Sequence, residues 1–386
     1  EESSSGLEIQ LPSRLAKLYI EPTSQCNLDC KTCMRNSWDE AQGMMSEEVF
    51  SRVLEGLKAF SPAPSVFFGG FGEPLFHPDI INMIKRIKEL GEKVELITNG
   101  TLLTKSMSLK LIEAGLDTLW VSIDGATPES YADIRLGATL PKVLENLHQF
   151  SKLINSLFGT EESHSLFPQS GTKLGIAFVA MKRNIADLPA VIDLGRKFGA
   201  EFYMLTNVLP YTPDMIKDVL YYQGVKDKEP SRVSMPQIDI NETTHIPVYE
   251  ALRKLSSTWS GFSSEKMKDR CPFIAKGAGA VRWDGDFSPC LPLLHSVTSY
   301  LDYLTNNNKR YTRHWSVGNI KERSLYALWN DPEHLAFRQR VQNFEFAPCT
   351  TCGNCDMILG NEEDCFGNTF PTCGGCLWAQ GVIQCP

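Results

Sequence analysis

The chain of 386 residues lacks any apolar run as long as the roughly 18 to 20 residues that a membrane-spanning helix needs. It also lacks a dense run of Lys or Arg, and its net charge is −8. Because phosphate binding requires a basic face, this charge pattern argues against a nucleic-acid partner. The first residues, Glu1 to Gly6, have the composition of a polar tail and not of a signal peptide. We therefore expect a cytoplasmic protein whose partners include neither a membrane nor a nucleic acid.

Cysteine, by contrast, is plentiful, with 12 residues in the chain. A reducing cytosol keeps thiols free, so metal binding explains this number better than disulfides do. Hydrophobic residues make up 42% of the chain and aromatic residues 10%, which is typical of a globular protein with a full core. The length allows about two or three domains. The cysteines divide into three near the amino terminus and nine beyond residue 261.

The first three, Cys26, Cys30 and Cys33, have the spacing C-x3-C-x2-C. Cubane iron–sulfur clusters normally take four cysteine ligands, so three thiolates from one loop leave one iron free to bind something that is not protein. An open coordination position is what separates catalytic metal sites from structural ones. For the triplet alone, a zinc knuckle or a disulfide pair is the alternative.

A glycine-rich turn, Gly69-Gly70-Phe71-Gly72-Glu73-Pro74, follows the apolar run Val66-Phe67-Phe68. Alone it is also typical of an ordinary strand-end loop. Together with the triplet, it resembles the radical S-adenosylmethionine (SAM) enzymes. The resemblance implies that Cys26, Cys30 and Cys33 hold a [4Fe-4S] cluster and that the methionyl amine and carboxylate of SAM chelate the fourth iron. It also implies that the turn holds the SAM amine through Gly70, Gly72, Glu73 and Pro74.

From about residue 15 to 260, strand-like apolar runs alternate with segments of helical period, the pattern of parallel strands joined by crossover helices. Helices are expected to begin near Ser46 and after His77. Two polar segments, 155–173 and 221–247, are interpreted as loop-rich surface insertions. The predicted strands are Lys17 to Glu21, Val66 to Gly69, Lys93 to Thr98, Thr118 to Ser122, Leu174 to Ala180 and Phe202 to Thr206.

Six such units resemble the partial (β/α)6 barrel of the radical SAM family, an α/β fold related to the TIM barrel. Ligands in such barrels lie at the carboxyl ends of the strands. Asn99 and Ser122 fall at two of these ends, where short polar side chains could bind ribose hydroxyls. Arg135 could pair with the methionyl carboxylate, because an arginine fork suits a carboxylate. Similarity to sulfatase-maturing relatives favours Ser122 and Arg135; an Asx-type turn and a surface arginine are the alternatives.

Beyond residue 261 the alternation stops and the cysteine-rich tail begins. Two cubanes would use eight of its nine cysteines, leaving one as a bystander, an exchangeable ligand or a redox partner. The spacing of Cys271, Gly285 and Cys290, followed by a C-x2-C cluster, is similar to the SPASM extension of some radical SAM enzymes. Zinc ribbons are the alternative. The nine candidate ligands are Cys271, Cys290, Cys349, Cys352, Cys355, Cys365, Cys373, Cys376 and Cys385.

The resemblance implies three [4Fe-4S] clusters, one that binds SAM and two auxiliary ones. It divides the chain into a polar tail at 1–14, a radical SAM barrel at 15–260 and a SPASM domain at 261–386. The triplet segment, together with Asp364-Cys365-Phe366-Gly367-Asn368 and the run from Cys373 to Gly381, is similar to SPASM proteins classed as maturases of tungsten-cofactor oxidoreductases.

The resemblance also implies the reaction. An electron donor such as ferredoxin or flavodoxin would drive reductive cleavage of SAM to a 5'-deoxyadenosyl radical, which abstracts hydrogen from a substrate. Because SPASM relatives commonly modify peptides or proteins, we expect a peptide or protein substrate first, and a small molecule or pterin-type metal cofactor second. A non-catalytic iron–sulfur electron carrier is the interpretation from a different class. Five histidines are interpreted as structural or surface residues: His77, His148, His295, His314 and His334.

Overall fold

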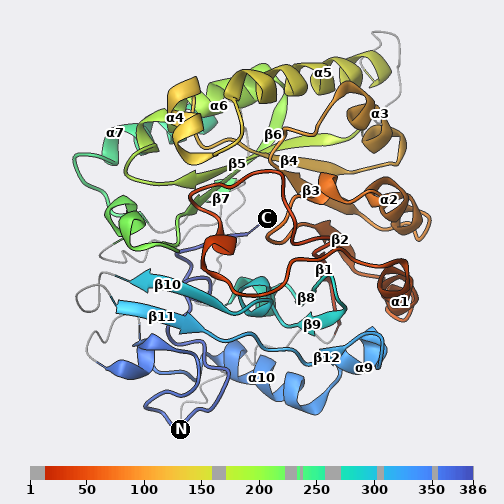
Figure 1. Cartoon of the computed structure of the whole chain (residues 1–386), viewed down its shortest axis with the longest axis vertical. Coiled ribbons are helices and arrows are strands. Elements are labelled where there is room, and N and C mark those ends of the chain that lie inside the picture. Colours follow the sequence, from red (N-terminus) through yellow and green to blue (C-terminus); the bar gives the residue numbers. More distant parts are fainter. Residues whose placement is uncertain are drawn as a thin grey trace, which may run out of the picture.

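The structure is a computed structural model that describes residues 14–158, 171–221, 233–234, 238–256, 271–301, 308–349 and 355–385. Six parallel strands pair in chain order at the centre of one curved sheet (Figure 1). Each overlaps a strand predicted from the sequence. They are β1 (Lys17–Ile20), β2 (Ser65–Phe68), β3 (Val94–Thr98), β4 (Thr118–Ser122), β5 (Lys173–Ala180) and β6 (Ala200–Asn207).

Helices cover the outside of this sheet (Figure 1). Ser46 caps the first one by accepting a hydrogen bond from the Val49 amide, as its position before an acidic first turn predicts. The second helix begins after Asp79, close to the predicted start. The helices are α1 (Glu47–Leu57), α2 (Ile80–Lys88), α3 (Lys105–Glu113), α4 (Pro128–Ile134), α5 (Leu140–Phe158), α6 (Leu188–Lys197) and α7 (His245–Ser256).

Alternate residues of the strands face two different cores. Leu18 and Ile20 of β1 belong to the large cluster that includes the outer helices. Tyr19 of β1 and Phe67 of β2 point the other way and pack with residues of the cysteine-rich tail. The inside of the barrel is therefore filled in part by the tail.

Parts of the two segments that we interpreted as loop insertions are regular structure. Helix α5 continues to Phe158 and β5 begins at Lys173. A short strand, β7 (Val233–Ser234), pairs with β6, and α7 begins at His245. Residues 159–170, 222–232 and 235–237 of these insertions lie outside the described residues.

The tail continues the barrel sheet. Strand β8 (Ala278–Val281) runs parallel to β1 along its free edge. Strand β9 (Asp286–Ser288) pairs antiparallel with β8, and β12 (Gly318–Asn319) pairs antiparallel with β9. A hairpin of β10 (Val297–Leu301) and β11 (Asn308–Thr312) lies beside them. The helices of the tail are α8 (Pro272–Ala275), α9 (Leu325–Trp329) and α10 (Pro332–Asn343). Two short 3-10 helices belong to the barrel segment, η1 (Met34–Ser37) and η2 (Pro74–Phe76). The predicted fold class, a partial barrel with a small cysteine-rich extension, is confirmed, whereas the boundary at 261 stays a prediction.

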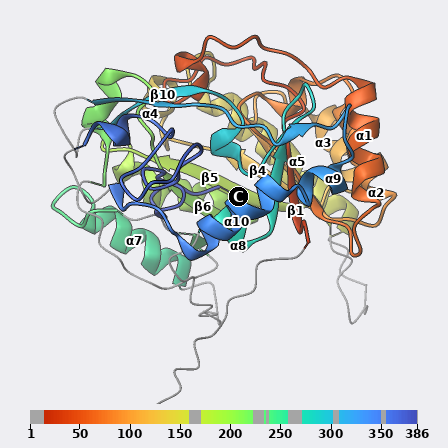
Figure 2. The ribbon, with the colours of Figure 1, turned by 90° about the horizontal axis from the view of Figure 1, so that it is seen from below.

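The end of the chain returns into the curve of the strands, where Figure 1 marks the C-terminus. The side-chain amide of Asn207 donates to the Val382 carbonyl over 3.0 Å, and the Gln384 amide donates to Thr206 Oγ1 over 2.9 Å. Figure 2 shows the tail, with α10, crossing the molecule between α7 and α1. The last residues are thus fixed to the carboxyl end of β6.

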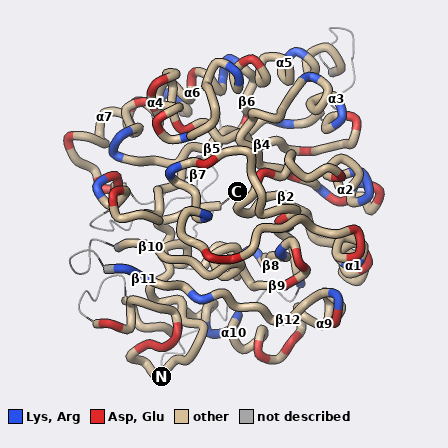
Figure 3. The backbone as a smooth tube through the Cα atoms, viewed as in Figure 1, with Lys and Arg blue, Asp and Glu red and all other residues tan. Residues whose placement is uncertain are grey.

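Positions of basic and acidic residues are interspersed along the outer elements of the backbone in the view of Figure 3. Within the described parts of the chain, no helix combines the length and apolarity needed to cross a bilayer.

Candidate active site

The cysteine triplet lies in the loop that follows β1, at the carboxyl end of the strand. Burial raises the pKa of the Cys30 thiol to about 11 and also raises that of Cys26. Cys33 adds to the rise in pKa of both thiols, and Cys26 adds to that of Cys30, so the three are close enough to interact electrostatically. The structure therefore brings Cys26, Cys30 and Cys33 together, as their spacing predicts.

Arg35 lies against the triplet, a contact that the sequence did not lead us to assign. Its Nε donates to Cys33 Sγ over 3.1 Å and its Nη2 donates to the Leu28 carbonyl over 2.7 Å. A guanidinium beside sulfur favours the thiolate, which is the form that binds iron. The Cys-x-Arg spacing is the only signal in the sequence that could have pointed to it.

The glycine-rich turn packs directly against the start of the cysteine loop. The Glu73 amide donates to the Gln25 carbonyl over 2.9 Å, and a Cβ on Gly72 would lie 2.0 Å from the Thr23 carbonyl oxygen. Gly70 has φ of +116°, a conformation that other residues rarely adopt. Only glycine at these two positions permits the turn to approach the loop as it does.

Glu73 links this turn to the end of β3. Its carboxylate accepts hydrogen bonds from the Leu75 amide, from Thr98 Oγ1 and from the Asn99 amide. The side chain is 2% exposed, and burial raises its pKa. Pro74 begins η2 immediately after it. Glu73 therefore shapes the turn through its own hydrogen bonds.

Asn99 joins the two parts of the site. Its Nδ2 donates to Asn27 Oδ1 over 3.0 Å and lies 3.8 Å from Cys26 Sγ. The residue predicted to lie near a SAM ribose is thus adjacent to the triplet loop, at the carboxyl end of β3.

Arg135 is buried next to Asp124, which follows β4. Its Nε donates to Asp124 Oδ2 over 2.8 Å, and Nη2 lies 2.6 Å from the same oxygen. Although burial opposes the charge, Asp124 and then Cys30 raise the pKa of Arg135. The predicted arginine is therefore close to the triplet but already paired with a carboxylate that sequence reasoning missed. Its contact with the SAM carboxylate stays a prediction, as does the contact of Ser122, which ends β4, with the SAM ribose.

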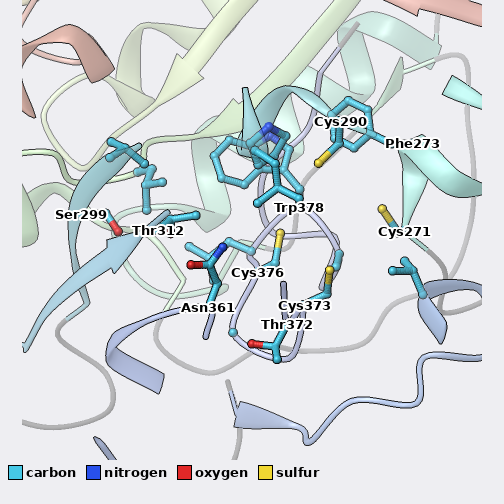
Figure 4. Close-up of a pocket in the computed structure, with 18 of the residues that line it drawn as sticks. Cys271, Phe273, Cys290, Ser299, Thr312, Asn361, Thr372, Cys373, Cys376 and Trp378 are labelled. Carbon is cyan, nitrogen blue, oxygen red and sulfur yellow. The ribbon is translucent and has the colours of Figure 1, made fainter. Parts of the chain in front are cut away.

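Four tail cysteines line one cavity, and Figure 4 shows their sulfur atoms directed into it. They are Cys271, Cys290, Cys373 and Cys376. Burial raises the pKa of all four thiols, that of Cys271 to about 12. Because a cubane takes four cysteine ligands, this donor set fits an auxiliary [4Fe-4S] cluster. Met34, next to Cys33, lines the same cavity and connects it to the triplet loop.

The other tail cysteines that the structure describes do not line this cavity. Cys355 and Cys365 are exposed, and Cys349 lies beside the loop of Gly374. Cys352 lies outside the described residues. Cys385 is partly buried near the end of the described chain and accepts a hydrogen bond from Trp378 Nε1 over 3.3 Å.

One histidine that we interpreted as structural is part of a charged network beside the turn. The two ring nitrogens of His295 lie 2.9 Å from Glu21 Oε2 and 2.7 Å from Glu40 Oε2. Nothing in the sequence signals this cluster, because His295 is more than 250 residues away from both glutamates along the chain.

Together these features define a class: an iron–sulfur enzyme built on a partial β/α barrel, with an open three-cysteine loop and a second thiol-lined cavity. A model of the radical SAM superfamily matches residues 20–160, and a model of the SPASM iron–sulfur cluster-binding domain matches residues 271–356. The chain belongs to the radical SAM superfamily, among its SPASM-containing enzymes, and it depends on iron–sulfur clusters and SAM.

Three similar proteins are informative. The chain is 30% identical to the tungsten-containing aldehyde ferredoxin oxidoreductase cofactor-modifying protein of Pyrococcus furiosus, over 96% of both chains. It is 23% identical to Fe-coproporphyrin III synthase of Methanosarcina barkeri, over 94% of this chain and 87% of that one. Streptococcus suis SuiB bound to S-adenosylmethionine has the same fold, with a TM-score of 0.58 at 16% identity, over 88% of this chain and 71% of SuiB.

Proposed function

We propose that this enzyme is a maturase that reductively cleaves SAM at the Cys26–Cys33 loop and abstracts hydrogen from the organic part of an oxidoreductase cofactor. The observation that carries the reaction is the contact between that loop and the turn at 70–74, at the carboxyl ends of β1 and β2. The loop that carries the three thiols is joined at its start to the turn, so a cluster and a nucleotide could be bound side by side.

The bound [4Fe-4S] cluster would supply the electron that converts SAM to a 5'-deoxyadenosyl radical. Cys26, Cys30 and Cys33 would hold it, and Arg35 would stabilise the Cys33 thiolate through its hydrogen bond. The SAM contacts that we propose are the backbone of the turn, Asn99, Ser122 and Arg135. Tyr19 and Phe67 line the interior of the barrel and would keep water away from the reacting atoms.

We propose two auxiliary clusters, for three in all. The cavity lined by Cys271, Cys290, Cys373 and Cys376 would hold one. The second would use Cys349, Cys352, Cys355 and Cys365, which leaves Cys385 as the ninth cysteine. A ferredoxin or flavodoxin would supply the electron, and the auxiliary clusters would take up the electron left on the substrate.

Two observations favour a compact substrate over the peptide that we expected from the sequence. The last residues of the chain occupy part of the barrel interior, which reduces the room for an extended peptide. In addition, a relative that is 30% identical over 96% of both chains is named for modifying a cofactor.

Deuterium transfer would test this function. A tungsten oxidoreductase is produced in deuterated medium, and its pterin-type cofactor and its polypeptide are supplied separately to the reduced enzyme with unlabelled SAM under nitrogen. We expect 5'-deoxyadenosine one mass unit heavier with the cofactor fraction only. Label arriving from the polypeptide alone would overturn the substrate proposal and restore the peptide interpretation. If no 5'-deoxyadenosine forms under any condition, the reaction itself is wrong.

A further inference from the structure

His295, which precedes β10 in the tail, is buried between two segments of the candidate SAM site. It is 1% exposed. Its Nε2 faces Glu21 Oε2 at 2.9 Å, and its Nδ1 faces Glu40 Oε2 at 2.7 Å. Glu21 follows β1 and is completely buried, and Glu40 lies in the loop that follows the cysteine triplet.

Both ring nitrogens must donate in this arrangement. An ionised carboxylate only accepts hydrogen bonds, and a neutral imidazole has a single N–H. The contacts with Glu21 and Glu40 can both be hydrogen bonds only when the ring is an imidazolium. Burial alone would lower the pKa of His295, but the charges and hydrogen bonds of Glu21 and Glu40 raise it to about 9.

Besides the His295 ring, each carboxylate also accepts a hydrogen bond from a backbone amide. Glu21 Oε1 accepts from the Phe71 amide over 3.1 Å, in the middle of the glycine-rich turn. Glu40 Oε1 accepts from the Ser296 amide over 2.7 Å. A path of hydrogen bonds therefore runs from the tail through His295 and Glu21 to the turn, and a second path runs through Glu40 to the loop after Cys33.

Aromatic packing holds the same three segments together. The Trp38 ring lies over His295 with centroids 4.1 Å apart, and Phe71 meets both rings edge-on. The cysteine loop, the glycine-rich turn and the tail therefore meet at His295.

We propose that His295 is a positioning residue for SAM: its imidazolium fixes the Glu21 carboxylate that orients the Phe71 amide and, with it, the turn that holds the SAM amine. The inference rests on the proposed function, in which residues 70–74 contact SAM. The SPASM segment thereby contributes to the SAM site as well as to the auxiliary clusters. Loss of the ring charge leaves a single N–H for the two carboxylates, so the contact that fixes Glu21, and with it the turn, is weakened.

The charged groups around the ring are Glu21 at the end of β1, Glu40 in the loop after η1, and Arg282 after β8, which lies 3.3 Å from Glu40. Arg282 in turn pairs with Asp284 and Asp286, and Asp286 with His314. The two carboxylates are nearest to the ring, so SAM affinity is expected to decline once the pH passes about 9.

Binding of SAM to the anaerobically reconstituted protein, measured by calorimetry from pH 7 to 10, tests the proposal. The variants are His295→Gln and Glu40→Gln, and His334→Gln is the matched control because His334 is a fully buried histidine packed in α10 and α9, away from the turn. The change in the electron paramagnetic resonance spectrum on adding SAM provides a second readout. Iron content and melting temperature show which variants are folded.

The wild type is expected to lose affinity by about tenfold per pH unit above pH 9. His295→Gln should bind SAM about tenfold more weakly at pH 7, with no further loss near pH 9, because a neutral amide has a single donor nitrogen and its other polar atom is an oxygen, which cannot donate to a carboxylate. Glu40→Gln should move the loss of affinity to lower pH, since one of the groups that raise the pKa of His295 is then neutral. The control should keep the wild-type profile. Titration of the SAM amine is common to all four proteins, so the differences report on His295.

A folded His295→Gln protein with wild-type affinity and pH profile would overturn the proposal. A Glu40→Gln protein with an unshifted profile would overturn it as well, and this variant decides the matter if His295→Gln does not fold. A wild-type protein that binds no SAM at any pH would instead refute the proposed function.

Discussion

Buried carboxylates place the loops of this site. Glu73 accepts three hydrogen bonds, two of them from backbone amides, and Asp124 accepts from the Val179 amide and from Arg135. Glu21 similarly binds the Phe71 amide. Hydrogen bonds to charged groups contribute about 1.5 to 3 kcal/mol each, and removing the acceptor leaves a buried donor unpaired. The loops around the triplet therefore depend on acidic residues that would not themselves bind iron.

The assignment of the tail cysteines predicts different results for two partly buried thiols. Cys376 lines the four-cysteine cavity, whereas Cys385 does not line it and accepts a hydrogen bond from Trp378. We expect Cys376→Ser to lower the iron content by about four atoms per chain, the content of one cubane. Cys385→Ser should keep the wild-type iron content. Iron and sulfide analysis after anaerobic reconstitution checks both, and equal losses in the two variants would contradict the assignment.

Protonation of His295 also makes stability depend on pH. The pKa of about 9 in the folded protein exceeds the ordinary 6.5, so the stabilisation is complete below pH 6.5 and is lost as the pH rises through 9. The loss corresponds to about 3 kcal/mol. We expect the melting temperature of the wild type, measured under nitrogen, to fall between pH 6.5 and 9.5 more steeply than that of His295→Gln. Parallel curves for the two proteins would show that the ring charge does not stabilise the fold.

Single residues were predictable where local spacing carries the signal. The triplet and the turn are short motifs, and the structure brings them together. Arg35 was visible in the sequence, but its hydrogen bond to Cys33 was not. Asp124 and His295 could not be assigned, because their roles arise from partners that only the fold brings near.

Among the elements, strands and crossover helices followed from periodicity, because long apolar runs and capping residues are local signals. Ser46 is an example, since its cap and the acidic residues after it mark the start of α1. Strand β8 was missed: its sequence Ala278–Val281 contains two Ala and one Gly, and it is recognisable as a strand only through its pairing with β1. Periodicity cannot predict a pairing between segments this far apart.

The turn between β2 and α2 depends on glycine because of its close approach to the cysteine loop. Gly72→Ala would place a methyl group 2.0 Å from the Thr23 carbonyl oxygen, so the turn must move. We expect this variant to lose SAM binding and to be less stable by about 1 to 3 kcal/mol. Calorimetric titration with SAM and thermal unfolding measure the two effects.

Gly91→Ala is the matched control for that turn. Gly91 has φ of +81° but no atom within 4 Å of the added methyl group. The variant should be less stable by about 1 to 2 kcal/mol and yet bind SAM as the wild type does. Similar SAM affinity in Gly72→Ala and Gly91→Ala would show that the contact between turn and loop does not form the site.

For the whole molecule, the tail is part of the barrel's architecture. Strand β8 covers the edge of β1, and Phe273 and Ile274 pack with Tyr19 and Phe67 in the interior. The final residues are bonded to the end of β6. The cysteine-rich segment and the barrel therefore share a sheet and a core, although the sequence divides them by composition.

Ending the chain at residue 260 should consequently prevent normal folding. It would expose the backbone of β1 and the apolar barrel interior, which favours aggregation. We expect this fragment to be insoluble or aggregated in size-exclusion chromatography, whereas a chain ending at Gly381 keeps all the strands described and should elute like the full chain. A soluble 1–260 fragment with native-like circular dichroism would show that the barrel does not need the tail.

The central claim is that three cysteines of one loop hold a cluster that activates SAM. The most direct measurement compares iron content and 5'-deoxyadenosine formation in the wild type and in Cys30→Ala, both reconstituted and reduced under nitrogen. We predict that the variant contains about one cubane less iron and forms no 5'-deoxyadenosine, while the cavity of Cys271 still holds its cluster. Wild-type SAM cleavage by Cys30→Ala, or a single zinc ion bound by the triplet, would contradict the account.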